Sequence, residues 1–306
     1  MTPEPIHRIA LIGFGEVGGI FGHDFAERGV DVTIYDILLH SPSARDAMLA
    51  KARDCRVQAR ESLRDCLRDA ELVISAVTAS SAAEVAEQSA PLLTVGQIYL
   101  DINSVSPETK SRMAEHVGRG AGHFVEAAVM AAVAAPRLKV PMLLGGPHAA
   151  KLAPRLAALG MNATPVSECV GVPSAVKMCR SVIIKGLEAL AVESMFAARR
   201  YGAEDAVLES LAATFPEMGW HDKLPDYLIS RVAEHGRRRA AEMREAADAV
   251  REVGLDPYMA SAVAQRQDWL VDEIAGRKLD ALDGKKFSWR ALADALATAA
   301  KSTQSR

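Results

Sequence analysis

The sequence predicts an α/β protein with an N-terminal doubly wound parallel sheet and an all-α C-terminal domain. In the first half, short apolar runs alternate with amphipathic stretches, which is typical of parallel strands covered by helices on both faces. In the second half, apolar residues recur with the period of an α-helix over long stretches, and no strand-like run appears among them. A chain of 306 residues is long enough for two domains. We expect these domains at residues 1–168 and 169–306.

Short apolar runs mark the expected strands of the first domain. They are Arg8–Ile12, Val32–Tyr35, Leu72–Val77, Ile98–Ile102, Phe124–Val125 and Met142–Leu144. Amphipathic stretches between them, such as Ile20–Arg28 and Ala82–Ala90, predict helices. Right-handed crossovers then wind the sheet in both directions from its first strand. Proline and glycine gather over Gly160–Pro173, and we place the break between the domains there.

Two long helices are expected in the second domain. Ser174–Arg200 is apolar on most sides and is predicted to be largely buried, and Tyr227–Val253 ends at a glycine. The chain after them is predicted to be helical up to a polar tail at Lys301–Arg306. The second long helix is rich in alanine over 240–249, a segment that could pack closely against another subunit, and we expect a homodimer formed through this domain.

The composition excludes several classes of function. Hydrophobic residues make up 49% and charged residues 25%, as in ordinary globular proteins. The net charge of −3 gives no basic field for nucleic acid or anionic lipid. The apolar run near Ala127–Ala135 is too short to span a membrane, and the N-terminus does not have the pattern of a signal peptide. The cysteines lack the spacing of a metal site or a disulfide framework, so we expect a cytoplasmic protein without metal.

A glycine-rich loop follows the first strand. Residues 9–18 read Ile-Ala-Leu-Ile-Gly-Phe-Gly-Glu-Val-Gly, an apolar strand that runs into G-x-G-x-x-G. The first glycine permits a tight turn, the second lets the backbone approach a pyrophosphate, and the third lets the next helix pack closely. The helix N-terminus offers free amides to phosphates. A Rossmann-type dinucleotide site is therefore expected at Gly13, Phe14, Gly15, Glu16, Val17 and Gly18.

An aspartate follows the second strand. Asp36 is the expected acceptor for the adenosine ribose hydroxyls. Its carboxylate would repel a 2′-phosphate, and the residues directly after it, Ile37–Leu39, include no arginine. The pattern favours NAD over NADP. Val77 and Thr78, after a later strand, are further candidates for cofactor contact, although core packing and a helix cap would explain them equally well.

A polar turn ends the strand at Ile98–Ile102. Ligands of doubly wound sheets bind outside the carboxyl ends of the strands, so Asn103 and Ser104 are expected to hold the substrate, and Asn103 also the cofactor. The turn also has a structural explanation, because Ser106-Pro107 is a typical start of a helix. Both explanations can hold together.

A lysine lies on the mostly apolar helix Ser174–Arg200. Lys177, Ser181 and Glu188 fall on one side of it, with Arg180 beside them. A buried lysine has its pKa lowered toward neutrality, which suits a general acid or base. A lysine that reaches the solvent, or a structural Lys177–Glu188 pair, would also explain the pattern.

Taken in order, these landmarks resemble the β-hydroxyacid dehydrogenases, relatives of 6-phosphogluconate and 3-hydroxyisobutyrate dehydrogenases. The resemblance begins at the glycine loop. The family's D-x-S-T, D-A-P-V-S-G-G and G-x-x-x-K-x-x-x-N segments correspond to Asp101–Ser104, Glu126–Ala132 and Pro173–Ser181. The resemblance implies the fold, hydride transfer, dimerisation through the helical domain, and Lys177 as the catalytic lysine.

The chain departs from the family pattern at several positions. Asn103 replaces a serine, Ser181 replaces an asparagine, and Pro173 replaces a glycine. Met130, Ala131 and Ala132 replace the Ser-Gly-Gly whose amides bind a carboxylate. The patterns at 177–181 and 235–243 resemble a divergent branch with a C-terminal domain of unknown function.

The resulting hypothesis is an NAD-dependent dehydrogenase acting on a small, anionic, β-hydroxyacid-like substrate. Lys177 would be the general acid and base, and Arg180 would bind the substrate carboxylate. Substrate contacts are also expected from Asn103, Ser104, Met130, Ala131, Ser181 and His235. His235 stands on the charged face of Tyr227–Val253, which is either solvated or closes over the substrate as a cation. The alternatives are an imine or ketone reductase and a non-catalytic NAD(H)-binding redox sensor.

Overall fold

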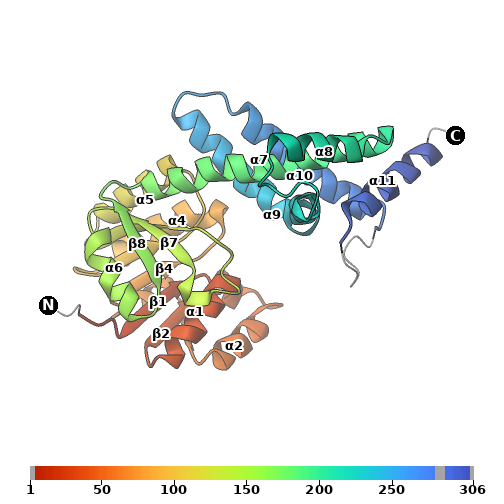
Figure 1. Ribbon diagram of the computed structural model, residues 1–306. Coiled ribbons are helices and arrows are strands. Elements are labelled where there is room, and N and C mark those ends of the chain that lie inside the picture. Colours follow the sequence, from red (N-terminus) through yellow and green to blue (C-terminus); the bar gives the residue numbers. More distant parts are fainter. Residues whose placement is uncertain (1–3, 280–286, 304–306) are drawn as a thin grey trace. The chain divides into compact units, whose positions relative to one another are not determined.

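The computed structural model describes residues 4–279 and 287–303 (Figure 1). The chain divides into two compact units, Met1–Lys177 and Met178–Arg306. The division falls inside helix α7 (Val172–Tyr201), whereas the boundary expected from the sequence precedes that helix. The predicted class is confirmed: a mostly parallel α/β sheet comes first, and helices follow.

Within the described residues, the first unit is built on an eight-stranded sheet of order β3-β2-β1-β4-β5-β6-β7-β8. The strands are β1 (Arg8–Ile12), β2 (Asp31–Tyr35), β3 (Gln58–Ala59), β4 (Leu72–Ser75), β5 (Ile98–Asp101), β6 (His123–Val129), β7 (Pro141–Gly145) and β8 (Asn162–Ser167). From β1 the sheet grows one way through β2 and the other way through β4. The carboxyl ends of β1, β2, β4 and β5 therefore share one edge, because these neighbours pair in parallel.

Three details of the sheet differ from the sequence prediction. The short strand β3 was not predicted, and β8 lies in the segment interpreted as the break between domains. The strand β8 has one neighbour and is mostly exposed, so it lacks an apolar run. The pair β6–β7 is antiparallel, because residues 130–140 between them form only the 3₁₀ turn η3 (Arg137–Lys139) and no crossover helix.

Helices cover both faces of the sheet, as predicted. They are α1 (Glu16–Glu27), α2 (Arg45–Asp54), α3 (Leu63–Leu67), α4 (Ala79–Ser89), α5 (Pro107–Gly118) and α6 (Ala149–Ala158), with 3₁₀ turns η1 (Ile37–His40) and η2 (Ala90–Leu92). The strand β1 shows the two-sided burial directly. Ile9 and Leu11 belong to one apolar cluster, and Ala10 and Ile12 belong to the other. Alternate side chains of this central strand thus fill two different cores.

The second unit is helical. After most of α7 come α8 (Glu204–Thr214), α9 (Leu224–Glu252), α10 (Tyr258–Gly276) and α11 (Trp289–Thr303). The two long helices are confirmed, and each begins slightly earlier than predicted. Pro225 occupies the first turn of α9, where proline is tolerated. The expected polar tail is helical up to Thr303, and its last three residues lie outside the described part of the chain.

Burial in the second unit corrects two expectations. The prediction that the helix now labelled α7 is largely buried is wrong for one of its faces, since Ile183 is 65% and Leu190 56% exposed. The alanines of 240–249 that were expected to meet another subunit are largely buried in the core between α9 and α10. None of the helices in the described residues is both long enough and apolar enough to cross a membrane.

Candidate functional site

The glycine loop sits between the carboxyl end of β1 and the start of α1. Gly13 has a φ of +88°, and a Cβ there would lie 2.4 Å from Ala76 O, so only glycine fits this turn. A Cβ on Gly18 would lie 2.1 Å from Gly13 O. At Gly15, in contrast, a Cβ would meet no atom within 4 Å. The loop is thus tight toward the protein and open at Gly15, where a pyrophosphate would approach the first amides of α1.

The other loop residues differ in environment. Phe14 is fully buried, Val17 is half-buried, and Glu16 is exposed in the first turn of α1. An acidic side chain is favourable at a helix N-terminus but would repel a phosphate. The backbone of Glu16 is therefore better suited to a dinucleotide than its side chain.

Asp36 is held against this loop. Its Oδ2 accepts a hydrogen bond from Phe14 N at 2.7 Å, and its Oδ1 accepts one from Leu38 N at 2.9 Å as the cap of η1. The two bonds fix the carboxylate at the carboxyl end of β2. Each carboxylate oxygen has a second lone pair, so Asp36 can still accept from ribose hydroxyls.

Lys51, which was not predicted from the sequence, also contacts the loop. Lys51 Nζ donates to the backbone oxygens of Phe14 and Gly15, each at 2.7 Å, and stands 4.8 Å from the centre of the Phe14 ring. A Cβ on Gly19 would lie 2.8 Å from this ammonium. Gly19 is not required by the G-x-G-x-x-G pattern, so this extra glycine was the available sequence signal. Lys51 places a positive charge beside the expected phosphate position.

Val77 and Thr78 follow β4 next to the loop. A Cβ on Gly13 would lie 3.0 Å from Val77 Cγ1, so Val77 borders the loop. Thr78 is exposed at the start of α4, where its hydroxyl exchanges hydrogen bonds with those of Ser80 and Ser81. Val77 and Thr78 remain predictions as cofactor contacts.

The polar turn after β5 is supported by a buried network. Asn103 Nδ2 donates to Asp101 Oδ1 and, at 2.9 Å, to Ser75 Oγ. Lys110 on α5 donates to Asp101 Oδ2. All four side chains are buried, and Lys110 was not expected from the sequence. Burial raises the pKa of the Asp101 carboxyl, and the hydrogen bonds and charge from Lys110 and Asn103 act in the opposite direction.

The start of α7 brings Lys177 to this turn. Lys177 Nζ donates to Ser104 Oγ. The helix is anchored by Glu126 of β6, whose carboxylate accepts from Gly171 N at 2.5 Å, from Ser174 N at 2.7 Å and from Ser174 Oγ. A buried carboxylate at a helix N-terminus is a favourable cap. The structure therefore joins two sequence-predicted site residues, Ser104 and Lys177, at the edge of the sheet that carries the glycine loop.

The segment directly after β6, residues 130–132, is less polar than the turn after β5. Met130 is half-buried, and its backbone N–H donates to Pro141 O at 2.9 Å. Ala131 and Ala132 are exposed. The amide of Met130 is therefore engaged inside the protein and is not available to a substrate carboxylate.

Three predicted residues, Arg180, Ser181 and His235, belong to the second unit and are described within it. Arg180 is exposed. Ser181 is buried and accepts from Lys185 Nζ at 3.0 Å, and Lys185 in turn lies 2.6 Å from Glu242 Oε2. Lys185 was not predicted from the sequence, although it shares the helix face of Ser181 one turn later.

Glu188 has a different partner from the one considered. Its Oε1 lies 2.9 Å from Arg239 Nη1, and its Oε2 accepts from Gln267 Nε2 at 3.4 Å. Lys177 instead donates to Ser104. The alternative of a structural Lys177–Glu188 pair is therefore wrong.

His235 is partly buried on α9. Burial and the neighbouring guanidiniums of Arg231 and Arg238 lower its pKa from an ordinary value near 6.5, against the smaller effect of Glu234. The direction of this shift favours the neutral imidazole over the cation, and a substrate contact by His235 stays a prediction. Arg238 donates to Glu242 on the next turn.

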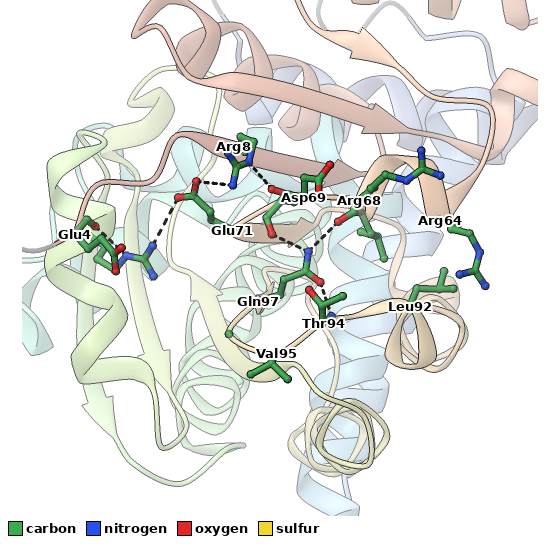
Figure 2. Close-up of a pocket in the computed structure, with 14 residues that line it drawn as sticks. Glu4, Arg8, Arg64, Arg68, Asp69, Glu71, Leu92, Thr94, Val95 and Gln97 are labelled. Atoms are coloured by element: carbon green, nitrogen blue, oxygen red, sulfur yellow. Dashed lines mark hydrogen bonds and ion pairs between the residues drawn. The ribbon is translucent and has the colours of Figure 1, made fainter.

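A separate cavity of about 570 Å³ lies at the opposite end of the sheet (Figure 2). It is bordered by Arg8 and Glu71, at the amino ends of β1 and β4. Glu71 lies 3.4 Å from Arg8 and 3.9 Å from Arg155, and Gln97 donates to the backbone oxygens of Leu67 and Ala70. These groups satisfy one another, and the cavity is distinct from the site at the carboxyl ends.

Two family models match the chain. The NAD binding domain of 6-phosphogluconate dehydrogenase matches residues 8–171, which is more than half of the chain. A domain of unknown function, DUF1932, matches residues 198–270 of the helical unit. The first match includes the glycine loop, Asp36 and the polar turn after β5.

Three similar proteins span most of the chain. An uncharacterized 28.5 kDa protein in the 7S RNA 5′ region of Methanothermus fervidus is 31% identical over 82% of this chain and 94% of its own length. The crystal structure of a conserved hypothetical protein from Sinorhizobium meliloti 1021 is 35% identical, with a TM-score of 0.81 and coverage of 97% of this chain and 98% of that one. A third, a conserved protein of unknown function, is 32% identical, with a TM-score of 0.72 and coverage of 87% and 97%.

The structure of the third protein is described as similar to 3-hydroxyacid dehydrogenases. The family-model match, the whole-length relatives and the dinucleotide-type loop agree with one another. The chain belongs to the family that carries the NAD binding domain of 6-phosphogluconate dehydrogenase, as a divergent member that is β-hydroxyacid dehydrogenase-like.

Proposed function

We propose that the protein is a dehydrogenase that uses NAD and acts on the hydroxyl-bearing carbon of a small, anionic, β-hydroxyacid-like substrate. The observation that carries the proposal is the Lys177–Ser104 hydrogen bond at the carboxyl end of β5. It puts a titratable amine at the edge of the sheet where the glycine loop, Asp36 and Lys51 form a fitting dinucleotide site.

The bound nicotinamide would accept the hydride from the substrate, or return it. The chain itself would handle the proton. Lys177 in its neutral form would take the proton of the substrate hydroxyl, and in the reverse direction its ammonium would return it. Ser104 would hold the amine in place by accepting its hydrogen bond.

Other residues would bind the substrate. Asn103 borders the same turn, and Met130 and Ala131 would supply the less polar wall. Arg180 stands within one turn of Lys177 along α7 and is exposed, which suits a partner for a carboxylate. Because the Met130 amide is engaged with Pro141, a side-chain cation is the better candidate for that charge.

The exposed apolar residues of α7 support a second part of the proposal, a homodimer. Ile183 and Leu190 lie two turns apart on one face and are mostly exposed. Large apolar side chains at this spacing are typical of helices that pack against a partner. The proposed subunit contact is therefore the surface of α7 and not the buried alanines of α9.

The test begins with thermal unfolding of the protein with NADH and, separately, NADPH. A ligand that binds only the folded state raises the unfolding midpoint. We expect a larger shift with NADH, because Asp36 disfavours a 2′-phosphate. A shift with NADPH alone would contradict the Asp36 argument, and no shift with either would contradict the dinucleotide site itself.

Turnover is tested next with NAD and a panel of β-hydroxy acids. Replacing Lys177 with Ala should lower kcat by about 10²–10⁴-fold, the usual contribution of a general acid or base. A loss below about tenfold, with unchanged NAD binding, would remove Lys177 from that role. Tight NADH binding without turnover of any hydroxy acid would favour a redox sensor instead.

A further inference from the structure

A buried ion pair lies directly behind the polar turn after β5. Asp101 and Lys110 are both fully buried, and Lys110 Nζ donates to Asp101 Oδ2 and, at 3.2 Å, to Asp101 O. Taking two charges out of water is costly, and an apolar pair of similar volume is often as stable or more so. The proposed proton transfer uses neither group. Stability alone is therefore a weak explanation for the pair.

The acid of the pair orients Asn103. Asn103 Nδ2 donates to Asp101 Oδ1 and to Ser75 Oγ, so both of its N–H donors are used. A carboxylate only accepts, and turning the amide over would place two oxygens against each other. In the part of the chain that the structure describes, no group donates to Asn103 Oδ1. The carbonyl oxygen is the atom left for a ligand.

We propose that Lys110 is a positioning residue that fixes Asn103 as a hydrogen-bond acceptor for a donor group of the bound ligand. By compensating the buried charge of Asp101, Lys110 keeps an acceptor-only carboxylate against the Asn103 amide. The inference rests on the proposed function, because it requires a dinucleotide and a substrate at this edge of the sheet. The facing donor is either the carboxamide N–H of the nicotinamide or an amine of the substrate.

The variant that tests this role must keep the core neutral. Lys110→Met alone would leave Asp101 buried without its partner and is expected to unfold the protein. Lys110→Met/Asp101→Asn removes both charges with little change in volume. An amide at 101 can donate or accept, so it no longer fixes the orientation of Asn103. Arg112→Met, an exposed cation on the same helix, is the matched control.

The measurement is a set of dissociation constants on the full-length protein. One arm compares NAD with its 3-acetylpyridine analogue, which lacks the carboxamide N–H. The other compares serine with 3-hydroxypropionate on the protein saturated with NADH, since the two differ by one amine. Leaving a buried acceptor unpaired costs about tenfold in affinity. In one arm, we expect wild type and Arg112→Met to bind the donor-bearing ligand about tenfold more tightly than its analogue. The Lys110→Met/Asp101→Asn variant should lose this preference.

The arm that shows the preference identifies the source of the donor. If wild type binds NAD but prefers the donor-bearing ligand in neither arm, the inference is overturned and the proposed function stands. The same holds if a folded double variant keeps the wild-type preference, because the pair is then merely structural. If wild type binds no dinucleotide, the proposed function fails, and this inference fails with it.

Discussion

Lys51 places a positive charge against the glycine loop. Its ammonium is shared by two carbonyl oxygens of the glycine loop and lies over the Phe14 ring. A cation in this place neutralises the carbonyl dipoles that a pyrophosphate would otherwise face. The same ammonium and Asp36 both contact Phe14, one at its oxygen and the other at its nitrogen. The loop is thus held between opposite charges.

We expect Lys51→Met to weaken NADH binding about two- to tenfold, as for the loss of a partly exposed charge interaction. The difference should shrink at high salt, because ions screen it. Calorimetric titration at two salt concentrations measures both effects. Arg53→Met on the same helix removes an equal charge and should bind as wild type does. Equal affinities in the two variants would leave Lys51 without a role in binding, and a larger loss for NADPH would place its action on the 2′-phosphate.

The candidate site residues that the sequence predicted are those tied to a local pattern. The glycine loop, Asp36, Ser104 and Lys177 follow from motif spacing and strand ends. Lys51 and Lys110 were missed because each meets its partner through the fold, as Lys185 meets Glu242. Lys51 is distant in sequence from the loop that it contacts, and Lys110 reaches back from α5 to the end of β5. A charged residue on an amphipathic helix looks the same in sequence whether it is solvated or buried.

At the scale of elements, the position of Lys177 depends on how α7 begins. Glu126 on β6 accepts hydrogen bonds from two backbone amides at that helix start and from Ser174 Oγ. Lys177, the proposed general acid and base, is therefore tied to the sheet through a strand and not through a flexible loop. The ring of Pro173, in the first turn of α7, packs against Gly145 of β7. A Cβ on Gly145 would lie only 2.7 Å from this ring, so the glycine allows the close contact that also holds the start of α7.

We expect Glu126→Gln to destabilise the protein by about 2–3 kcal/mol, because a charged acceptor is lost and an amide N–H would face N–H donors. For a unit of this size, the unfolding midpoint should fall by about 4–12 °C. Differential scanning calorimetry measures the shift, and kcat should fall with it as Lys177 loses its support. Glu168→Gln, an exposed residue just before α7, is the control. An unchanged midpoint would mean that Glu126 does not anchor the helix.

Most elements were predictable, and the exceptions have physical causes. Strands buried on both faces, such as β1, appear in the sequence as apolar runs. The long helices are marked by apolar residues that recur with the period of a helix. The edge strand β8 is exposed and contains Pro165, so it resembles a loop. The antiparallel direction of β7 could not be predicted from its own residues, because it depends on the short connection after β6.

At the scale of the whole molecule, the remaining question is how the exposed face of α7 is covered. Ile183 and Leu190 are large apolar side chains that are mostly exposed. Met195 and Val192 on the same helix are buried in the core of their unit. The helix thus has one face in the core and another facing outward. A stable subunit interface buries about 1,200–2,000 Å² in total, which a helix of this length can supply together with its neighbours.

We expect the wild-type protein to be a dimer and Ile183→Asp/Leu190→Asp to be a monomer, because two carboxylates would be buried unpaired at the contact. Size-exclusion chromatography with light scattering measures the mass directly. Val95→Asp, at an exposed valine of the first unit, matches the chemical change and should leave the dimer intact. Circular dichroism separates dissociation from unfolding, since the substituted side chains are exposed within their own unit. A wild-type protein that elutes as a monomer, or a double variant that stays dimeric, would show that this face of α7 is not the subunit contact.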